Sequence, residues 1–149
     1  SQAGVLVKAN NRSIQSYADL AGQKVATQAG STGPVILAKF APKAVVQEFQ
    51  THQESLDALR QGRVQAYVTD YTLLLNALSL GTTNARLAGA PFGEQDPYGI
   101  GLPKGSDGVA FINGFLKKLE ADGTWAKLWM VSIGQRTGAT VAPKPPVLP

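Results

Sequence analysis

A short polar turn between two apolar stretches has residue types that are suited to holding an anion. The turn, Gly30-Ser31-Thr32-Gly33, follows a β-prone run and opens an apolar run that starts at Pro34. The first N–H groups of a helix have no partner within the helix and lie at the positive end of its dipole. Small residues let an anion approach these groups, and the two hydroxyls of the turn add donors. The turn therefore fits a carboxylate or a phosphate.

A carboxylate occurs at a second position of this kind. Asp70 ends the β-prone run at residues 64–70. Ligands of parallel α/β sheets bind at the carboxyl ends of the strands, where both the turn and Asp70 are expected. A carboxylate there can pair with an ammonium group. Together the two features fit an α-amino acid, which carries both charges on one carbon.

Both features also have a simpler structural interpretation. Ser or Thr before a helix is most often only an N-cap, and Asp70 is well placed to cap a helix over residues 71–80. For Asp70, capping and ligand binding are compatible roles. The turn lacks the Gly-Lys-Ser/Thr of a phosphate-binding P-loop, and it is not a Gly-x-Gly-x-x-Gly sequence.

The residue types give little support to metal or covalent chemistry. The chain has no cysteine, which excludes disulfides and thiol catalysis, and its one histidine leaves no second imidazole for a metal. That histidine, His52, stands beside Gln53 and Glu54 and is expected to be a solvated polar residue. Ser31 has no histidine partner for nucleophilic catalysis. We therefore expect no metal and no cofactor.

Length and charge narrow the class of protein further. The 149 residues, 44% of them hydrophobic, are enough for one domain with a core. The formal charge is +4, but basic residues are spread from Lys8 to Lys144 without the dense basic face that nucleic-acid binding needs. The longest apolar run, residues 72–80, is too short to cross a bilayer. No signal peptide is present, which predicts either a cytoplasmic protein or a mature or trimmed chain.

Residues 4–92 alternate between β-prone and helical stretches, which predicts an α/β fold. Short joints favour βαβ units with right-handed crossovers, so we expect a mainly parallel sheet with helices on both faces. The expected strands cover residues 4–9, 23–28, 44–49, 64–70 and 85–89, and the expected helices cover residues 16–22, 32–41, 52–62 and 71–81. We expect Ser16 and Asp19 to form a variant of the capping box at the start of the first helix, and Gly62 to be the C-cap of the third.

The pattern changes at Pro97. We expect a strand that runs into a Pro/Gly turn at residues 98–106, an amphipathic helix at 107–123, a second short helix at 124–134 and an extended Pro-rich tail at 135–149. The two helices have strong apolar faces but little sheet nearby in the sequence to cover. The residues of these faces are Phe111, Ile112, Phe115, Leu116, Leu119, Trp125, Leu128 and Trp129.

Four blocks of the sequence resemble a known family. They are SYADLAGQKVATQAGST (16–32), ESLDALRQGRVQAYVTD (54–70), PYGIGLPKGS (97–106) and INGFLKKLEADGTWAKLW (112–129). In this order they resemble the family 3 extracellular solute-binding proteins, the polar-amino-acid binders of ABC importers. The resemblance runs from about residue 4 to residue 132 and is specific for the family, though not for the ligand.

The resemblance implies a periplasmic-binding-protein-like fold, in which two α/β lobes joined by two crossing strands close on an amino acid. This chain would hold mainly the second lobe, at residues 10–92, after a crossing strand at 1–9. A crossing segment and C-terminal helices at 93–134, which normally pack on the first lobe, and the tail at 135–149 would follow. We expect the N-terminal portion of the first lobe to be absent from this chain.

The resemblance also implies which residues meet the ligand. Thr32, with Ser31 and Gly33, would meet its α-carboxylate, and Asp70 would meet its α-amino group.

Two further positions, Gln28 and Thr69, match residues that often line the pocket for the ligand's side chain. The arginine that normally clamps the carboxylate belongs to the first lobe. Gln65 replaces the aspartate usual in the family. Gln28 indicates a polar ligand without selecting among Gln, Asn, Glu, Arg or His.

By this resemblance the chain is not an enzyme but the incomplete, one-lobe form of a protein that delivers a polar amino acid to the membrane subunits of an ABC importer. The expected location is periplasmic or extracellular, with lipid or membrane association on the outer side. Because the C-terminal helices lack their usual partner lobe, they would either swap onto a neighbouring chain or fold back on their own lobe. We expect self-association, and a segment-swapped homodimer is one form of it.

Two other functions use the same fold. A few dehydratases and accessory domains of lytic transglycosylases have it, and such an enzyme needs a general acid or base in the cleft. The spare carboxylates are those of Glu48, Glu54 and Asp57, and none of them is at an expected strand end. A ligand-sensing domain of a receptor kinase would share the proposed site.

Overall fold

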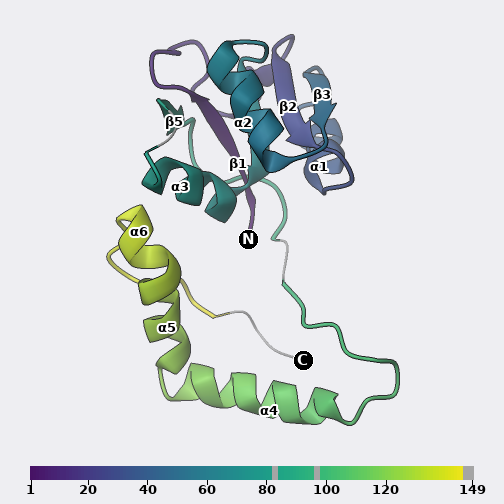
Figure 1. The fold of residues 1–149 in the computed structure, drawn as a ribbon, viewed down its shortest axis with the longest axis vertical. Helices are drawn as coiled ribbons and strands as arrows, with labels where there is room; N and C mark the ends of the chain where they lie inside the picture. Colours follow the sequence, from purple (N-terminus) through teal and green to yellow (C-terminus); the bar gives the residue numbers. More distant parts are fainter. Residues whose placement is uncertain (82–83, 96–97, 146–149) are drawn as a thin grey trace. The chain divides into compact units, whose positions relative to one another are not determined.

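The computed structural model describes residues 1–81, 84–95 and 98–145, and the chain divides into two compact units (Figure 1). The first unit is Ser1–Asp96 and the second is Pro97–Pro149. Pro97, where the sequence pattern changes, lies outside the described residues. Within the described residues, no helix has both the length and the apolar character that crossing a membrane would require.

The first unit is built on a five-stranded mixed sheet in the order β3-β2-β4-β1-β5. All five expected strands are present; the first is shifted by one residue and the other four are slightly shorter than predicted. Their bounds are β1 Ala3–Lys8, β2 Lys24–Gln28, β3 Val45–Phe49, β4 Ala66–Asp70 and β5 Ala85–Leu87. Strand β2 is parallel to β3 and β4, while β1 is antiparallel to both β4 and β5. Four strands therefore share one direction, and β1 runs against them.

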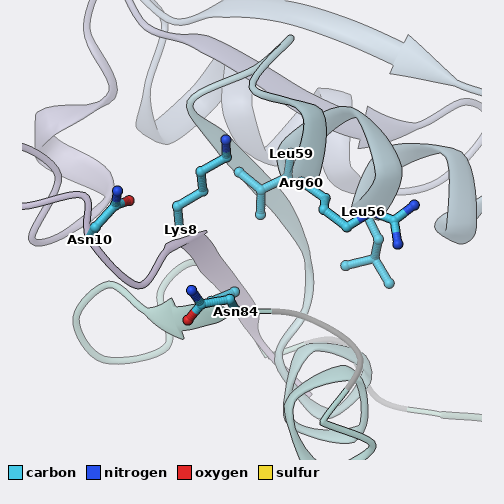
Figure 2. A pocket seen from close by; sticks show the side chains of 7 residues that line it. Lys8, Asn10, Leu56, Leu59, Arg60 and Asn84 are labelled. Atoms are coloured by element: carbon cyan, nitrogen blue, oxygen red, sulfur yellow. The ribbon is translucent and has the colours of Figure 1, made fainter.

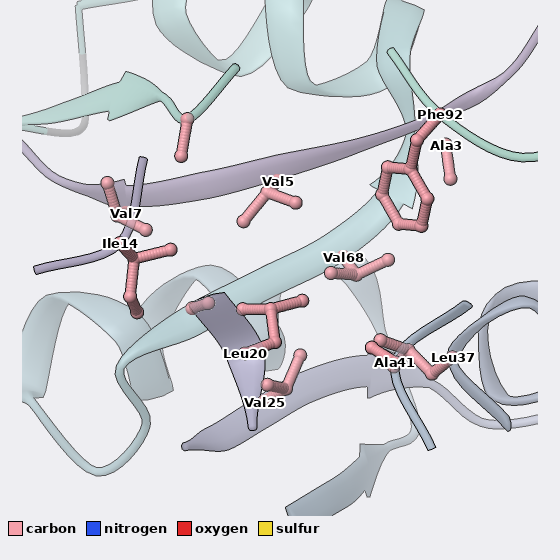
Figure 3. Close-up of a cluster of buried hydrophobic side chains, with 12 residues drawn as sticks. Ala3, Val5, Val7, Ile14, Leu20, Val25, Leu37, Ala41, Val68 and Phe92 are labelled. Carbon is pink, nitrogen blue, oxygen red and sulfur yellow. The ribbon is translucent and has the colours of Figure 1, made fainter. Parts of the chain in front are cut away.

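Helices cover both faces of the sheet, as predicted from the βαβ pattern. Helix α1 (Gly33–Phe40) packs on one face through Leu37, in a cluster with Val5, Val25 and Val68 (Figure 3). On the opposite face, α2 (His52–Gln61) and α3 (Tyr71–Ser79) pack in a second buried cluster. The members of that second cluster are Leu6, Ala26, Leu56, Ala58, Leu59, Val64, Tyr67, Leu74 and Ala77.

Local sequence signals set the ends of several helices. The predicted capping box of Ser16 and Asp19 is confirmed, and it opens a short 3-10 helix, η1 (Tyr17–Leu20). Thr51 and Glu54 form a second capping box at the start of α2. Gly62 ends α2 with φ of 78°, a backbone conformation that favours glycine, as predicted for its C-cap.

The second unit is helical. It contains α4 (Gly108–Ala121), α5 (Thr124–Trp129), a π-helical turn η2 (Met130–Gly134) and a last short turn α6 (Gln135–Thr137). Among the described residues of this unit, only Gly134 is buried. A Cβ on Gly134 would lie 2.7 Å from the sulfur of Met130, so a side chain at this position would require the Met130 side chain to move.

Two predictions for this part of the chain are wrong. Residues 98–106 form no strand, because Gly99 and Gly101 have low β propensity and no described strand lies beside this segment to pair with it. The tail is not extended from its start, since residues 135–137 continue the helical path of η2. Its last residues, 146–149, lie outside the described residues.

Candidate functional site

The anion-suited turn and Asp70 lie at one edge of the sheet. Strands β2 and β4 are parallel neighbours, paired at Val25 with Ala66 and at Ala26 with Tyr67. They end at Gln28 and Asp70, so the residues that follow both strands meet at the same edge. The turn and Asp70 therefore share one edge of the sheet, as the sequence predicted from the parallel strands.

Ser31 is committed to the turn itself. Its hydroxyl donates to the carbonyl oxygen of Gln28 over 2.7 Å and accepts the N–H of Gly33 over 3.2 Å. A hydroxyl has one hydrogen, so in this arrangement Ser31 has none left to donate to a ligand. Ser31 therefore stabilises the turn. The sequence predicts that both hydroxyls of the turn are donors for an anion, and for Ser31 this is wrong.

Thr32 occupies the N-cap position of α1 but does not cap it through its side chain. The residue is exposed, and within the described residues its hydroxyl has no hydrogen-bond partner. The simpler interpretation of Thr32 as a side-chain cap is therefore wrong. With Ser31 excluded, the donors at this edge are the Thr32 hydroxyl and the backbone N–H groups in the first turn of α1.

Gly33 is required by close packing beneath the turn. A Cβ at this position would lie 1.9 Å from Oγ1 of Thr27 on β2. Thr27 is fully buried, and its Oγ1 has no hydrogen-bond partner among the described residues. The first turn of α1 thus rests directly on β2, and only a residue without a side chain permits this approach. The sequence showed a glycine here but not the reason for it.

Asp70 caps α3, as one interpretation of the sequence predicted. Its Oδ1 accepts the backbone N–H of Thr72 over 2.8 Å and the hydroxyl of the same residue over 2.6 Å. The side chain is half-buried. Capping fixes the orientation of the carboxylate at the end of β4, so the same interaction that starts the helix also positions the negative charge at the sheet edge.

The two predicted pocket residues flank the ends of β2 and β4. Gln28 is half-buried, and its Nε2 donates to the carbonyl oxygen of Gln50 over 3.4 Å, at the end of β3. Thr69 is 8% exposed and pairs with Gly4 of β1 in the antiparallel register. Gln28 is therefore accessible, whereas Thr69 contributes a small exposed surface beside Asp70.

His52 is not the solvated polar residue that the sequence predicted. Its ring is half-buried, and Nδ1 lies 2.8 Å from the hydroxyl of Tyr67 on β4. Burial lowers the pKa of His52 from its usual value of 6.5. No pattern in the sequence indicates this pair, because the two residues are fifteen positions apart and belong to different elements.

Two hollows lie at the opposite edge of the sheet. They have volumes of about 240 and 430 Å³ and share Lys8 and Asn10. Strand β1 is antiparallel to β4, and Ala3 at the start of β1 pairs with Asp70. Lys8, at the end of β1, therefore lies at the opposite edge of the sheet from Asp70. Figure 2 shows Leu56, Leu59 and Arg60 of α2 facing Lys8 and Asn84 across the smaller hollow. None of the predicted ligand-binding residues lines either hollow.

Within the described residues, no group of three or more potential metal ligands occurs.

Comparison with known proteins identifies the relatives of this chain. No protein-family model matches it. It is 35% identical over 127 residues to the ABC transporter glutamine-binding protein of Bacillus subtilis, an alignment that covers 84% of this chain and 45% of that protein. It is 31% identical over 138 residues to the glutamate-binding protein of Corynebacterium glutamicum, covering 88% and 46%.

Solved structures with a similar fold also match this chain. An ancestral arginine-binding protein bound to glutamine matches with a TM-score of 0.76 and 33% identity, over 89% of this chain and 60% of that one. In sequence and in fold, the chain is therefore similar to amino-acid-binding solute-binding proteins. The relatives cited here are named as binding proteins and not as enzymes. The chain spans about half the length of the curated relatives it matches.

Proposed function

We propose that this chain is a ligand-binding lobe for a polar amino acid, in a protein that serves an ABC importer. One observation carries the proposal: helix α1 begins and Asp70 is fixed at the same edge of two neighbouring parallel strands. The helix N-terminus and the Thr32 hydroxyl hold the α-carboxylate, and Asp70 holds the α-amino group. Gln28 and Thr69 contact the ligand's side chain. Ser31 and Gly33 form the turn that brings the carboxylate close to the backbone.

The site on one lobe binds weakly by itself. A single lobe supplies one set of polar contacts and cannot exclude water from the ligand. We expect a binding free energy of about 4–6 kcal/mol, which corresponds to dissociation constants from high micromolar to millimolar. In a two-lobed protein, closure of a second lobe adds the remaining contacts and produces the shape that the transporter recognises.

Replacement of Asp70 by Asn is the sharpest test. Asn caps helices as well as Asp, so Asp70→Asn retains an acceptor for the bonds from Thr72 and removes the charge. Titration with glutamine, glutamate and arginine, followed by NMR, should show weak binding by the natural chain and roughly tenfold weaker binding by the variant. The matched control is Asp19→Asn, which changes a capping carboxylate before β2, at the other edge of the sheet.

Two results would contradict this function. Equal affinity of Asp70→Asn and the natural chain would mean that no ammonium group binds there. Nanomolar binding by a monomer would contradict a site made by one lobe.

We further propose that the chain forms a segment-swapped homodimer through its second unit. Phe111 is 75% exposed and Phe115 is 51% exposed, and both lie on α4. Exposed apolar side chains of this size on one helix favour burial against another chain.

Light scattering should give the mass of a dimer, and the double substitution Phe111→Ser with Phe115→Ser should give a monomer. Val35→Ser, at an equally exposed apolar position on α1, should leave the dimer intact. A natural chain that is monomeric at all concentrations would reject the swap.

The proposed cellular setting follows from the same role. A protein that delivers amino acids to the membrane subunits of an importer works in the periplasm or outside the cell, in lipid or membrane association on the outer side. Fractionation of cells that express the gene from its own locus tests this location, and recovery in the cytoplasm would contradict it.

A further inference from the structure

The larger of the two hollows has no part in the proposed function, and we call it the basic hollow. It lies at the edge of the sheet opposite Asp70 and has a volume of about 430 Å³. Three segments line it: the end of β1 with the loop that follows, the glycine that ends α2, and the two residues before β4. The lining residues are Lys8, Asn10, Asn11, Arg12, Ser13, Gly62, Val64 and Gln65.

The charged side chains of the basic hollow are both positive. Lys8, which lines both hollows (Figure 2), is half-buried, and Arg12 is exposed. Among the described residues, neither of them forms a salt bridge and no carboxylate lines either hollow. Arg60 of the smaller hollow differs, because its guanidinium pairs with Asp57 over 3.0 Å. The basic hollow therefore has two cations whose charge no lining residue compensates.

The ammonium group of Lys8 lies beside the end of α2. A Cβ added to Gly62 would be 3.2 Å from Nζ of Lys8, and the C-terminal end of a helix attracts cations. The N–H group of Gly62 already bonds to the carbonyl oxygen of Leu59 over 3.1 Å. The N–H group of Arg63 bonds to that of Ala58 over 2.9 Å. The helix end thus places Lys8 at the hollow, while two of its last carbonyls are satisfied without the lysine.

The side-chain amide of Asn11 is oriented by three bonds within its own loop. Its Oδ1 accepts the N–H of Ser13 over 3.0 Å, the hydroxyl of Ser13 over 3.1 Å and the N–H of Ile14 over 3.1 Å. A backbone N–H can bond only to the oxygen of an amide side chain, so this orientation is fixed. Asn11 therefore offers a ligand its NH₂ group, whereas Ser13 has already used its one hydroxyl hydrogen.

Gln65 is oriented in the same way from a different segment. Its Oε1 accepts the N–H of Lys24, the first residue of β2, over 3.0 Å. The NH₂ group of this half-buried side chain is again the part that is left for a ligand. The hollow thus combines two cations with two amides whose oxygens are already bonded. These four side chains can donate hydrogen bonds, so they suit an anion.

We propose that the basic hollow binds the phosphoryl group of a phosphate monoester. Such a group has a charge of about −1.5 to −2 near pH 7, which matches the two cations, whereas a carboxylate has one charge. Its three oxygens accept from several directions, as donors on three separate segments require, whereas a carboxylate accepts near one plane. A soluble phosphate ester and a lipid headgroup share this chemistry.

The test is a titration with inorganic phosphate at constant ionic strength, followed by NMR of the side-chain NH₂ signals of Asn11 and Gln65. We expect a dissociation constant of about 1–10 mM, because the bound ion stays partly hydrated. Lys8→Met retains the apolar stem and removes the charge, so it should weaken binding roughly tenfold. Lys8→Arg retains the charge and should recover most of the affinity.

Two further variants separate the hollow from the general charge of this edge. Lys43 is exposed just before β3, at the same edge, and it does not line the hollow, so Lys43→Met should change the affinity by less than about twofold. Gln65→Glu retains the oxygen that Lys24 needs but replaces the NH₂ group by a negatively charged oxygen, so it should abolish binding. Urea unfolding of each variant shows whether it is folded.

Three results would overturn the proposal. The first is the absence of phosphate-dependent shifts at Asn11 and Gln65. The second is an equal affinity of Lys8→Met and the natural chain, or an equal loss in Lys8→Met and Lys43→Met. The third is equal affinity for acetate and phosphate, since acetate has one charge and should bind several-fold more weakly.

Vesicles distinguish the two sources of the phosphoryl group. Phosphatidylcholine vesicles with and without phosphatidic acid are sedimented with the chain, because phosphatidic acid presents a phosphate monoester on a surface. Binding that needs phosphatidic acid and is lost in Lys8→Met, but not in Lys43→Met, assigns the hollow to a lipid headgroup. Binding of phosphate without binding of the vesicles assigns it to a soluble ester.

Discussion

The two units of this chain have similar apolar patterns and very different burial. In the described part of Ser1–Asp96, 21 apolar residues form a core on the two faces of one sheet. In the described part of Pro97–Pro149, Gly134 is the one buried residue, although α4 has a clear apolar face. The difference teaches that periodicity is enough to form a helix, while a core needs a second layer that packs against it.

The largest contrast should appear in the unfolding free energy. Leu37 is fully buried against β2 and β4, so Leu37→Ala should lower the stability of the first unit by about 2–5 kcal/mol. Phe111 is 75% exposed, so Phe111→Ala should change the stability of a monomer by less than about 0.5 kcal/mol. Urea unfolding of dilute protein, followed by circular dichroism, measures both. A comparable loss in the two variants would show that α4 is packed in the monomer.

Replacing one glycine in each unit by alanine compares the units through smaller changes in stability. Gly33→Ala places a Cβ against Thr27 and should cost about 1–3 kcal/mol, with loss of ligand binding. Gly114 of α4 has no atom within 4 Å of an added Cβ, so Gly114→Ala should instead stabilise the helix, by about 0.5–1 kcal/mol.

A third variant tests the cause of the Gly33 effect. Combining Gly33→Ala with Thr27→Ala removes the clashing Oγ1 and should recover part of the lost stability. Losses that simply add in the double variant would mean that Thr27 is not the obstacle. Urea unfolding of the two single variants and the double variant supplies the comparison.

The smallest expected effects are pH dependences of the folded structure, and they differ between the two units. In the first unit, burial lowers the pKa of His52, so the unfolded chain takes up a proton before the folded chain does. Stability should therefore fall as the pH drops below about 6.5, and His52→Gln should remove this dependence.

In the second unit, bonds from the hydroxyl and backbone of Thr124 lower the pKa of Asp122 to about 2. The contribution of this carboxylate to the α4–α5 turn should persist until the pH falls below its usual 3.8, and it should be lost toward pH 2. Amide chemical shifts of Thr124, measured from pH 7 to pH 2, follow the turn. A change between pH 7 and pH 5 that Asp122→Asn abolishes would contradict the assignment.

Local signals in the sequence predicted the elements well where each signal acts through neighbouring residues. The capping box of Ser16 and Asp19 and the glycine end of α2 at Gly62 are both confirmed. The strand at residues 98–106 is wrong because a strand depends on a partner that composition cannot supply. The edge shared by the turn and Asp70 could be predicted because parallel strands bring their carboxyl ends together.

By itself the sequence determined the α/β alternation, the helix ends and the positions of the anion-suited turn and of Asp70, because periodicity, caps and turns act over a few residues. The tertiary structure decided that Ser31 serves the turn, that Gly33 rests on Thr27 and that His52 meets Tyr67. These contacts join separate elements, and their geometry exists only after the sheet and helices have packed.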